Sequence, residues 1–168
     1  MEKIKSSSGK MAKFAGVLGI FAIVCAVLCV IGAVMGFAMN GFINQYYSDP
    51  EHINAAAGSL NADMGIFNIL PFDAIRDAGN YGIYFGLQLL CAAVICGVYV
   101  YLFFTLKKVL SNIGETGAAF AESESGKFKV NFIIITVIFV LFKGLAVGAI
   151  VGLILFGLYN VSLAVSKK

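Results

Sequence analysis

Long apolar stretches separated by short polar ones dominate the pattern of this chain. Residues 14–39 and residues 82–106 contain no charged side chain, and a third apolar region covers residues 128–165. The hydrocarbon core of a bilayer is about 30 Å thick, and a helix needs about 20 residues to cross it. The pattern therefore predicts an all-α integral membrane protein.

The third apolar region is interrupted near its centre by Lys143 and Gly144, and this interruption decides the number of spans. A single uninterrupted helix gives three spans and buries the Lys143 ammonium, at a cost of about 2.5 kcal/mol or more. A tight turn gives two spans instead, at residues 126–142 and 145–165. Glycine readily adopts the left-handed backbone that ends a helix, and a lysine there faces the negative end of the helix dipole. We predict four transmembrane helices, the last two a tight hairpin, and keep three spans as the alternative.

The distribution of basic residues favours the same topology. With four spans, all of the 12 Lys and Arg residues except Arg76 and Lys143 lie on the side of the N-terminus. Cytoplasmic loops carry an excess of these residues. The chain is therefore expected to be one multi-pass domain, residues 1–168, in the bacterial cytoplasmic (inner) membrane with its N-terminus in the cytoplasm. Residues 40–81 form the outer loop and residues 107–125 the inner loop.

Composition argues against several classes of function. The chain is 60% hydrophobic and 12% charged, whereas soluble domains are about 25% charged. The predicted spans contain no Asp, Glu or His, which disfavours an enzyme and a proton-coupled carrier, since both need positioned titratable groups. No catalytic residue and no cofactor are predicted. A net charge of +3 is too small to indicate a nucleic-acid partner.

The sequence also gives little indication of a metal site or of reactive thiols. Asp49, Glu51 and His52 form the one cluster of typical ligand types, but they are almost adjacent and no second histidine exists, so no metal site is predicted. The cysteines lie inside the predicted spans and are interpreted as small packing residues: Cys25, Cys29, Cys91 and Cys96.

Small residues follow one face of the first span at alternating spacings of four and three: Ala15, Gly19, Ala22, Ala26, Cys29, Ala33 and Gly36. A glycine zipper opens the fourth span: Gly144, Gly148 and Gly152. Helices in lipid associate where small side chains let their backbones approach. Both sets are predicted helix-packing faces, within the chain or with a second copy, unless they merely reflect the high Ala and Gly content of membrane helices.

Apolar residues also cluster in the second half of the outer loop. Phe67, Leu70, Phe72 and Ile75 alternate with charged residues around Pro71. This pattern predicts a short helix lying in the membrane interface, which we call the cap segment. It is interpreted either as a lid or docking surface for an external ligand or, preferably, as a cover for the helix ends.

The inner loop is basic at its start and acidic and Ser-rich at its end, which fits a solvated connector better than a docking loop. Residues 106–128, LKKVLSNIGETGAAFAESESGKF, resemble the signature of a bacterial family of small four-span membrane proteins of unknown function, often encoded beside a Cro/CI-type helix-turn-helix regulator. The matching positions are Leu106, Lys107, Lys108, Asn112, Ile113, Gly117, Phe120, Glu122, Glu124 and Phe128. Ala119 stands where that family usually has proline, one extra residue lies near Thr116, and the last two spans are closer together. The resemblance implies four spans with this loop inside, and no catalytic or ligand residues.

Two classes of function remain. The favoured one is a non-enzymatic interaction, sensor or accessory subunit, whose partners are the lipid bilayer and a membrane protein or a second copy of the chain. The alternative is a small channel or exporter, formed by oligomerisation and lined by Gln88, Thr136 and Asn160. Those three polar residues are few and scattered for a conducting path.

Overall fold

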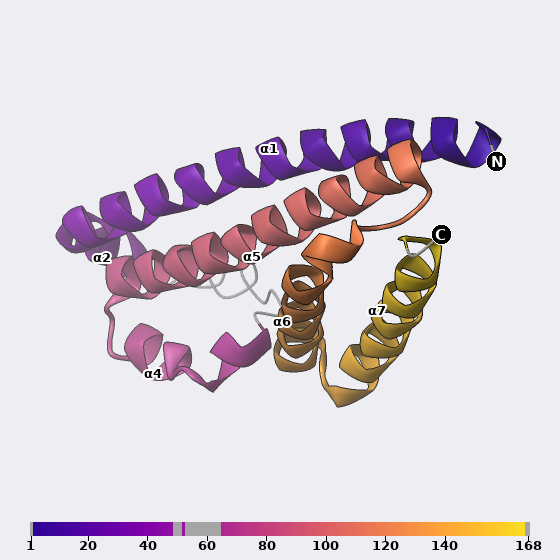
Figure 1. Cartoon of the computed structure of the whole chain (residues 1–168). Helices are drawn as coiled ribbons and strands as arrows, with labels where there is room; N and C mark the ends of the chain where they lie inside the picture. Colours follow the sequence, from indigo (N-terminus) through magenta and orange to yellow (C-terminus); the bar gives the residue numbers. More distant parts are fainter. Residues whose placement is uncertain (1, 49–51, 53–64, 167–168) are drawn as a thin grey trace. The chain divides into compact units, whose positions relative to one another are not determined.

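The computed structural model describes residues 2–48, 52 and 65–166, and the part of the chain it describes contains helices and no strand. The elements are α1 (Glu2–Ala38), α2 (Asn40–Tyr47), the 3-10 helix η1 (Gly65–Ile69), α4 (Phe72–Asp77), α5 (Tyr81–Thr116), the 3-10 helix η2 (Glu122–Glu124), α6 (Ser125–Lys143) and α7 (Leu145–Ser166) (Figure 1). Helices α1, α5, α6 and α7 are long and apolar enough to cross a membrane. The prediction of an all-α, four-span membrane protein is confirmed.

The turn between α6 and α7 consists of Gly144 alone. Its φ is 87°, a backbone conformation that costs any residue with a Cβ about 1–2 kcal/mol. The Gly144 N–H donates to the Val140 carbonyl at 3.0 Å, which closes the last turn of α6. Figure 1 shows α6 and α7 running back along one another as a hairpin. A single helix through Lys143, as the three-span alternative requires, is therefore excluded.

Helices α1 and α5 are longer than a bilayer requires. They contain 37 and 36 residues, against the need for about 20. Helix α5 continues to Thr116, past the predicted span end at residue 106, and α1 begins at Glu2. The extra turns carry the lysines that flank the apolar stretches: Lys10 and Lys13 in α1, and Lys107 and Lys108 in α5.

The chain divides into two compact units, which are described separately. The first unit contains Met1–Ala22 and Val98–Lys168, with the end of α5, α6 and α7. Its core includes Phe120 and Phe128, both fully buried, with ring centroids 5.2 Å apart. The Phe120 ring also lies 5.2 Å from that of Tyr159 on α7. This aromatic cluster joins the segment between α5 and α6 to both helices of the hairpin.

The second unit, Ile23–Gly97, contains the end of α1, α2, η1, α4 and the start of α5. Helices α1 and α5 approach closely here at three glycines. A Cβ built on Gly36 would lie 3.1 Å from the Gly82 carbonyl oxygen and 3.2 Å from the Gly86 Cα. Glycine at these positions allows the backbone contact, as expected for helices that pack in lipid.

The cap segment differs from the single interfacial helix that the sequence predicts. It consists of η1 and the six-residue α4, with a break at Pro71. Proline lacks an N–H and disfavours helical backbone at the preceding residue, so one continuous helix cannot form across it. Within α4, the Arg76 guanidinium nitrogens lie 3.0 Å from Asp73 Oδ1 and 3.1 Å from Asp77 Oδ1. The hydrogen bond to Asp77 raises the pKa of Arg76 above its usual value.

Candidate functional site

The small residues of α1 face inward in both units, whereas bulky neighbours such as Val24 and Leu28 are exposed. In the first unit, a Cβ on Gly19 would lie 3.1 Å from the Phe104 ring. In the second unit, Gly36 meets the backbone of α5. The structure places these members in buried or half-buried positions: Ala15, Gly19 and Ala22 in the first unit, and Ala26, Cys29, Ala33 and Gly36 in the second.

The three glycines at the start of α7 have two different roles. A Cβ on Gly148 would lie 2.8 Å from the Val140 backbone nitrogen, and one on Gly152 would lie 3.0 Å from the Thr136 methyl group. Gly144, by contrast, has no heavy atom within 4 Å of a built Cβ. Its assignment as a helix-packing residue is therefore corrected: it reverses the chain, and only Gly148 and Gly152 lie in the contact between α6 and α7.

Exposure differs among the residues of the cap segment. The Phe72 ring meets that of Tyr84 edge to face, with centroids 6.4 Å apart. Phe67, Phe72 and Ile75 are half-buried, whereas Leu70 is 40% exposed and Ile69 is 82% exposed. Of the predicted cap residues, Phe72 therefore covers part of the start of α5.

Two asparagines that the sequence reasoning missed hold the start of α5. Asn44 Oδ1 accepts a hydrogen bond from the Gly82 N–H at 3.2 Å, and Asn40 Oδ1 accepts one from the Ile83 N–H at 3.1 Å. The first N–H groups of a helix have no partner within that helix. Helix α2 therefore acts as an external cap, and the signal for it was the spacing of four between Asn40 and Asn44.

The connecting loop between α5 and α6, residues 117–124, is folded. The Asn112 Nδ2 donates to the Ala119 carbonyl at 2.8 Å, and the Ala119 N–H donates to the Ser162 hydroxyl of α7 at 3.0 Å. Ala119 and Phe120 are completely buried. The interpretation of this segment as a solvated connector is wrong at these positions, because the Phe120 ring and the Ala119 amide are enclosed by α5, α6 and α7.

A charged pair lies beside the connecting loop. The Lys108 ammonium is 3.4 Å from Glu124 and 5.1 Å from the centroid of the Phe128 ring. Both side chains are partly exposed, so the pair contributes little stability, about 0–1 kcal/mol. The pair places a positive charge on α5 and a negative charge directly before α6, both beside the connecting loop.

The polar residues considered for a conducting path lie in different environments. Gln88 is buried, and its Oε1 has no hydrogen-bond partner among the described residues. The Thr136 hydroxyl donates to the Phe132 carbonyl of its own helix at 2.8 Å, and Asn160 is exposed. The Thr136 hydroxyl is therefore committed to its own helix, and Asn160 lies on the surface of α7.

Thiols and candidate metal ligands form no metal site in the described part of the chain. All four cysteines are free, and no group of three potential ligands occurs among the described residues. His52 stacks on Tyr46, with ring centroids 4.1 Å apart. Asp49 and Glu51, the other members of the predicted cluster, lie outside the described residues.

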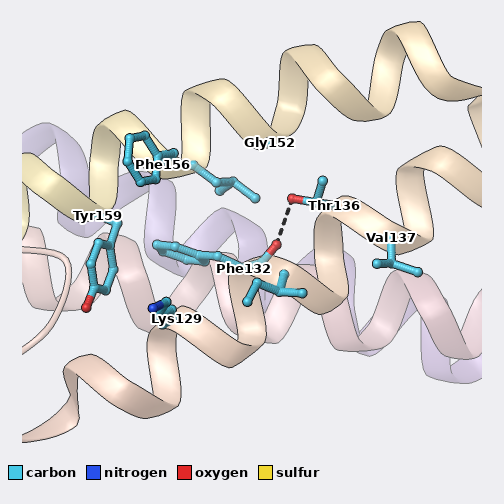
Figure 2. Close-up of a pocket in the computed structure, with 9 residues that line it drawn as sticks. Lys129, Phe132, Thr136, Val137, Gly152, Phe156 and Tyr159 are labelled. Carbon is cyan, nitrogen blue, oxygen red and sulfur yellow. Dashed lines mark hydrogen bonds between the residues drawn. The ribbon is translucent and has the colours of Figure 1, made fainter.

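A groove runs between α6 and α7 in the first unit. It encloses about 460 Å³, and Figure 2 shows Lys129 and Tyr159 at one end with Val137 towards the other. Its walls are mainly apolar and include Phe132, Phe156 and the Thr136 methyl group. Sequence reasoning missed this groove; the available signal was a lysine one turn inside an apolar span.

No protein-family model, no curated protein and no solved structure matches this chain.

Proposed function

We propose that this protein is a non-enzymatic interaction or accessory subunit whose connecting loop docks a partner protein at the membrane surface. The observation that carries the proposal is the folded state of that loop. A solvated tether needs only length, whereas this loop buries Phe120 and holds Ala119 between Asn112 and Ser162. A pre-ordered surface loses less conformational entropy when it binds.

The charges around the loop favour a protein as its partner, rather than a surface that carries charge of one sign. Exposed or partly exposed groups of both signs lie on α5, η2 and α6: Lys108, Glu115, Glu124 and Lys127. Mixed charges favour orientation and partner selection rather than general attraction.

Orientation and origin form part of the same proposal. The lysine distribution supports a bacterial cytoplasmic membrane with the N-terminus and the connecting loop in the cytoplasm. The resemblance of residues 106–128 to the four-span family found beside Cro/CI-type regulators supports the same side for the loop. Gly19 and Gly36 of α1, and Gly148 with Gly152, already pack within the chain, so we place the contact with a partner at the connecting loop.

Photo-crosslinking in living cells tests this proposal. A photo-reactive amino acid placed at the exposed Ser123 should give one reproducible adduct with a protein identified by mass spectrometry. Ser162→Ala removes the hydroxyl that holds Ala119 and should weaken that adduct, whereas Ser111→Ala, on the exposed surface of α5, should leave it unchanged. No adduct at Ser123, or equal effects of the two variants, would overturn the proposal.

A small channel is the second candidate, and it is favoured by the buried amide oxygen of Gln88, which has no partner in the part of the chain that the structure describes. An unsatisfied buried acceptor is costly, and ions or water passing along α5 would supply its partner. The purified protein in vesicles should then conduct ions, and Gln88→Leu should abolish the flux. Absence of flux in the wild type would eliminate this alternative.

A further inference from the structure

The groove between α6 and α7 combines an apolar body with a polar end. Its volume is about 460 Å³, and the Lys129 and Tyr159 side chains lie together at one end in Figure 2. We propose that this groove binds an acidic phospholipid: one acyl chain lies along the groove, and the headgroup phosphate pairs with Lys129 and accepts a hydrogen bond from Tyr159. This inference is independent of the docking role proposed for the connecting loop.

The body of the groove suits an acyl chain. Its lining includes Ile133, Val137 and Phe156, which are 56%, 50% and 65% exposed, on helices that span the membrane. Lys129 and Val137 are eight residues apart on α6, which corresponds to about 12 Å along the helix axis. A flexible hydrocarbon chain can follow such a path, and its contact with these side chains is apolar throughout.

The volume argues against a second helix as the occupant. A helix with its side chains is about 10–12 Å across, so a 12 Å length of it occupies about 900–1,400 Å³. That is about two to three times the volume of the groove, so a helix could pack side chains against it but could not lie inside it. Free phosphate is also a poor occupant, because it would leave the apolar length of the groove unfilled. A lipid meets both requirements at once.

The polar end of the groove provides charge complementarity. No described acidic side chain forms an ion pair with Lys129, whereas Lys108 on α5 is paired with Glu124. Lys129 lies one turn after α6 begins at Ser125, at the end of the span where headgroups lie. Basic positions between transmembrane helices at this depth favour anionic headgroups.

Tyr159 offers a hydrogen-bond donor to the lipid phosphate. Its ring is held against Phe120, with centroids 5.2 Å apart and planes inclined by 32°. Its hydroxyl forms no hydrogen bond with any described residue. The Tyr159 ring therefore presents an O–H donor, unpaired among the described residues, at the same end of the groove as Lys129, and phosphate oxygens accept from both kinds of donor.

Photo-labelling of the full-length protein in lipid nanodiscs tests the proposal. The discs contain phosphatidylcholine and a trace of photo-activatable phosphatidylglycerol with a diazirine in its acyl chain; a phosphatidylcholine probe with the same chain is the matched lipid. Peptide mass spectrometry should place adducts on groove residues of α6 and α7. We expect about fivefold more labelling by the acidic probe, the contribution expected of one lysine near a membrane surface.

Variants separate the headgroup contact from the groove. Lys129→Ala should reduce the acidic-lipid preference to near one, Lys129→Arg should retain it, and the neighbouring exposed Lys127→Ala is the matched control. Val137→Phe keeps the charge but adds bulk at the far end, so it should lower labelling by both probes. Thermal unfolding of every variant in detergent confirms that the fold is kept, and Lys129→Gln replaces Lys129→Ala if that variant fails to fold.

Three results would overturn the proposal. Equal labelling by the two lipids would show that the site does not select an anionic headgroup. Equal effects of Lys127→Ala and Lys129→Ala, or no effect of Val137→Phe, would indicate general attraction of acidic lipid to the membrane surface. Adducts between groove residues and a second copy of the chain, instead of lipid, would assign the groove to an interface between copies.

Discussion

The backbone contact between α1 and α5 at Gly82 gives a sharp prediction about stability. A Cβ at this position would lie 2.5 Å from the Asn40 Cα and 2.7 Å from the Gly36 carbonyl oxygen. Both neighbours are backbone atoms, so no side-chain rotation can relieve the overlap. To reach an ordinary contact of 3.4 Å, the two segments must separate by about 0.9 Å.

The magnitude follows from two contributions. Overpacking by one methyl group in a tight contact costs about 1–3 kcal/mol. The same separation stretches the hydrogen bonds from Gly82 to Asn44 and from Ile83 to Asn40, which are now 3.2 and 3.1 Å long. Each contributes about 0.5–1.5 kcal/mol. We expect Gly82→Ala to lower the free energy of unfolding by about 2–6 kcal/mol, or the melting temperature by about 4–24 °C.

The protein carries its own probes for this measurement. Cys25, Cys29, Cys91 and Cys96 are free and lie in the same unit as Gly82, so a fluorogenic maleimide reacts with them as this unit opens on heating in mild detergent. Gly97→Ala is the matched control on the same helix, because a Cβ there has no heavy atom within 4 Å. Alanine is the better helix former, by up to about 1 kcal/mol, so this control should melt at the wild-type temperature or slightly higher. If Gly82→Ala and Gly97→Ala melt together, the close backbone approach is refuted.

Three further substitutions test other contacts. Ser162→Ala leaves the buried Ala119 N–H without its acceptor and should cost about 1–3 kcal/mol, measured as a lower thermal aggregation midpoint and faster proteolysis of the connecting loop. Gly144→Ala forces a Cβ into a backbone of φ 87° and should cost about 1–2 kcal/mol by the same midpoint, whereas Gly157→Ala, in open space on α7, should not. Ala26→Leu should destabilise the protein by about 1–3 kcal/mol and Val24→Leu, which is 50% exposed before substitution, should be tolerated; equal maleimide melting curves would contradict this.

The four spans could be predicted because hydropathy reports directly on the membrane environment. A long stretch of apolar side chains tolerates no exposed backbone polar group in lipid, so helix is the available structure. The position of the hairpin depended on one local feature, a lysine followed by glycine, and Gly144 indeed has a positive φ of 87°, with ψ at 167° rather than in the left-handed helical region. Both inferences use information contained within a few turns of sequence.

The connecting loop could not be predicted in this way. Its polar, Ser-rich composition is typical of solvated segments, yet Ala119 is held by Ser162, 43 residues further along the chain. The contact exists only because α6 and α7 form a hairpin that returns Ser162 to the start of α6. The groove beside Lys129 has the same origin: its walls come from two helices, and no pattern within either helix specifies the gap between them.

Most buried polar groups beside the spans follow one physical rule, and Gln88 is the exception. A backbone N–H without a partner costs several kcal/mol in lipid, and Asn40 and Asn44 satisfy two such groups at the start of α5. Ser162 does the same for Ala119. Gln88 departs from the rule, because its buried Oε1 has no partner among the described residues.

If the Gln88 oxygen has no partner in the membrane either, Gln88→Leu should stabilise the protein, since exchanging a buried, unsatisfied acceptor for an apolar group removes a cost of about 1–3 kcal/mol. If Gln88→Leu instead destabilises the protein in nanodiscs, an external donor satisfies Gln88 in the membrane, and α5 contacts a polar partner there.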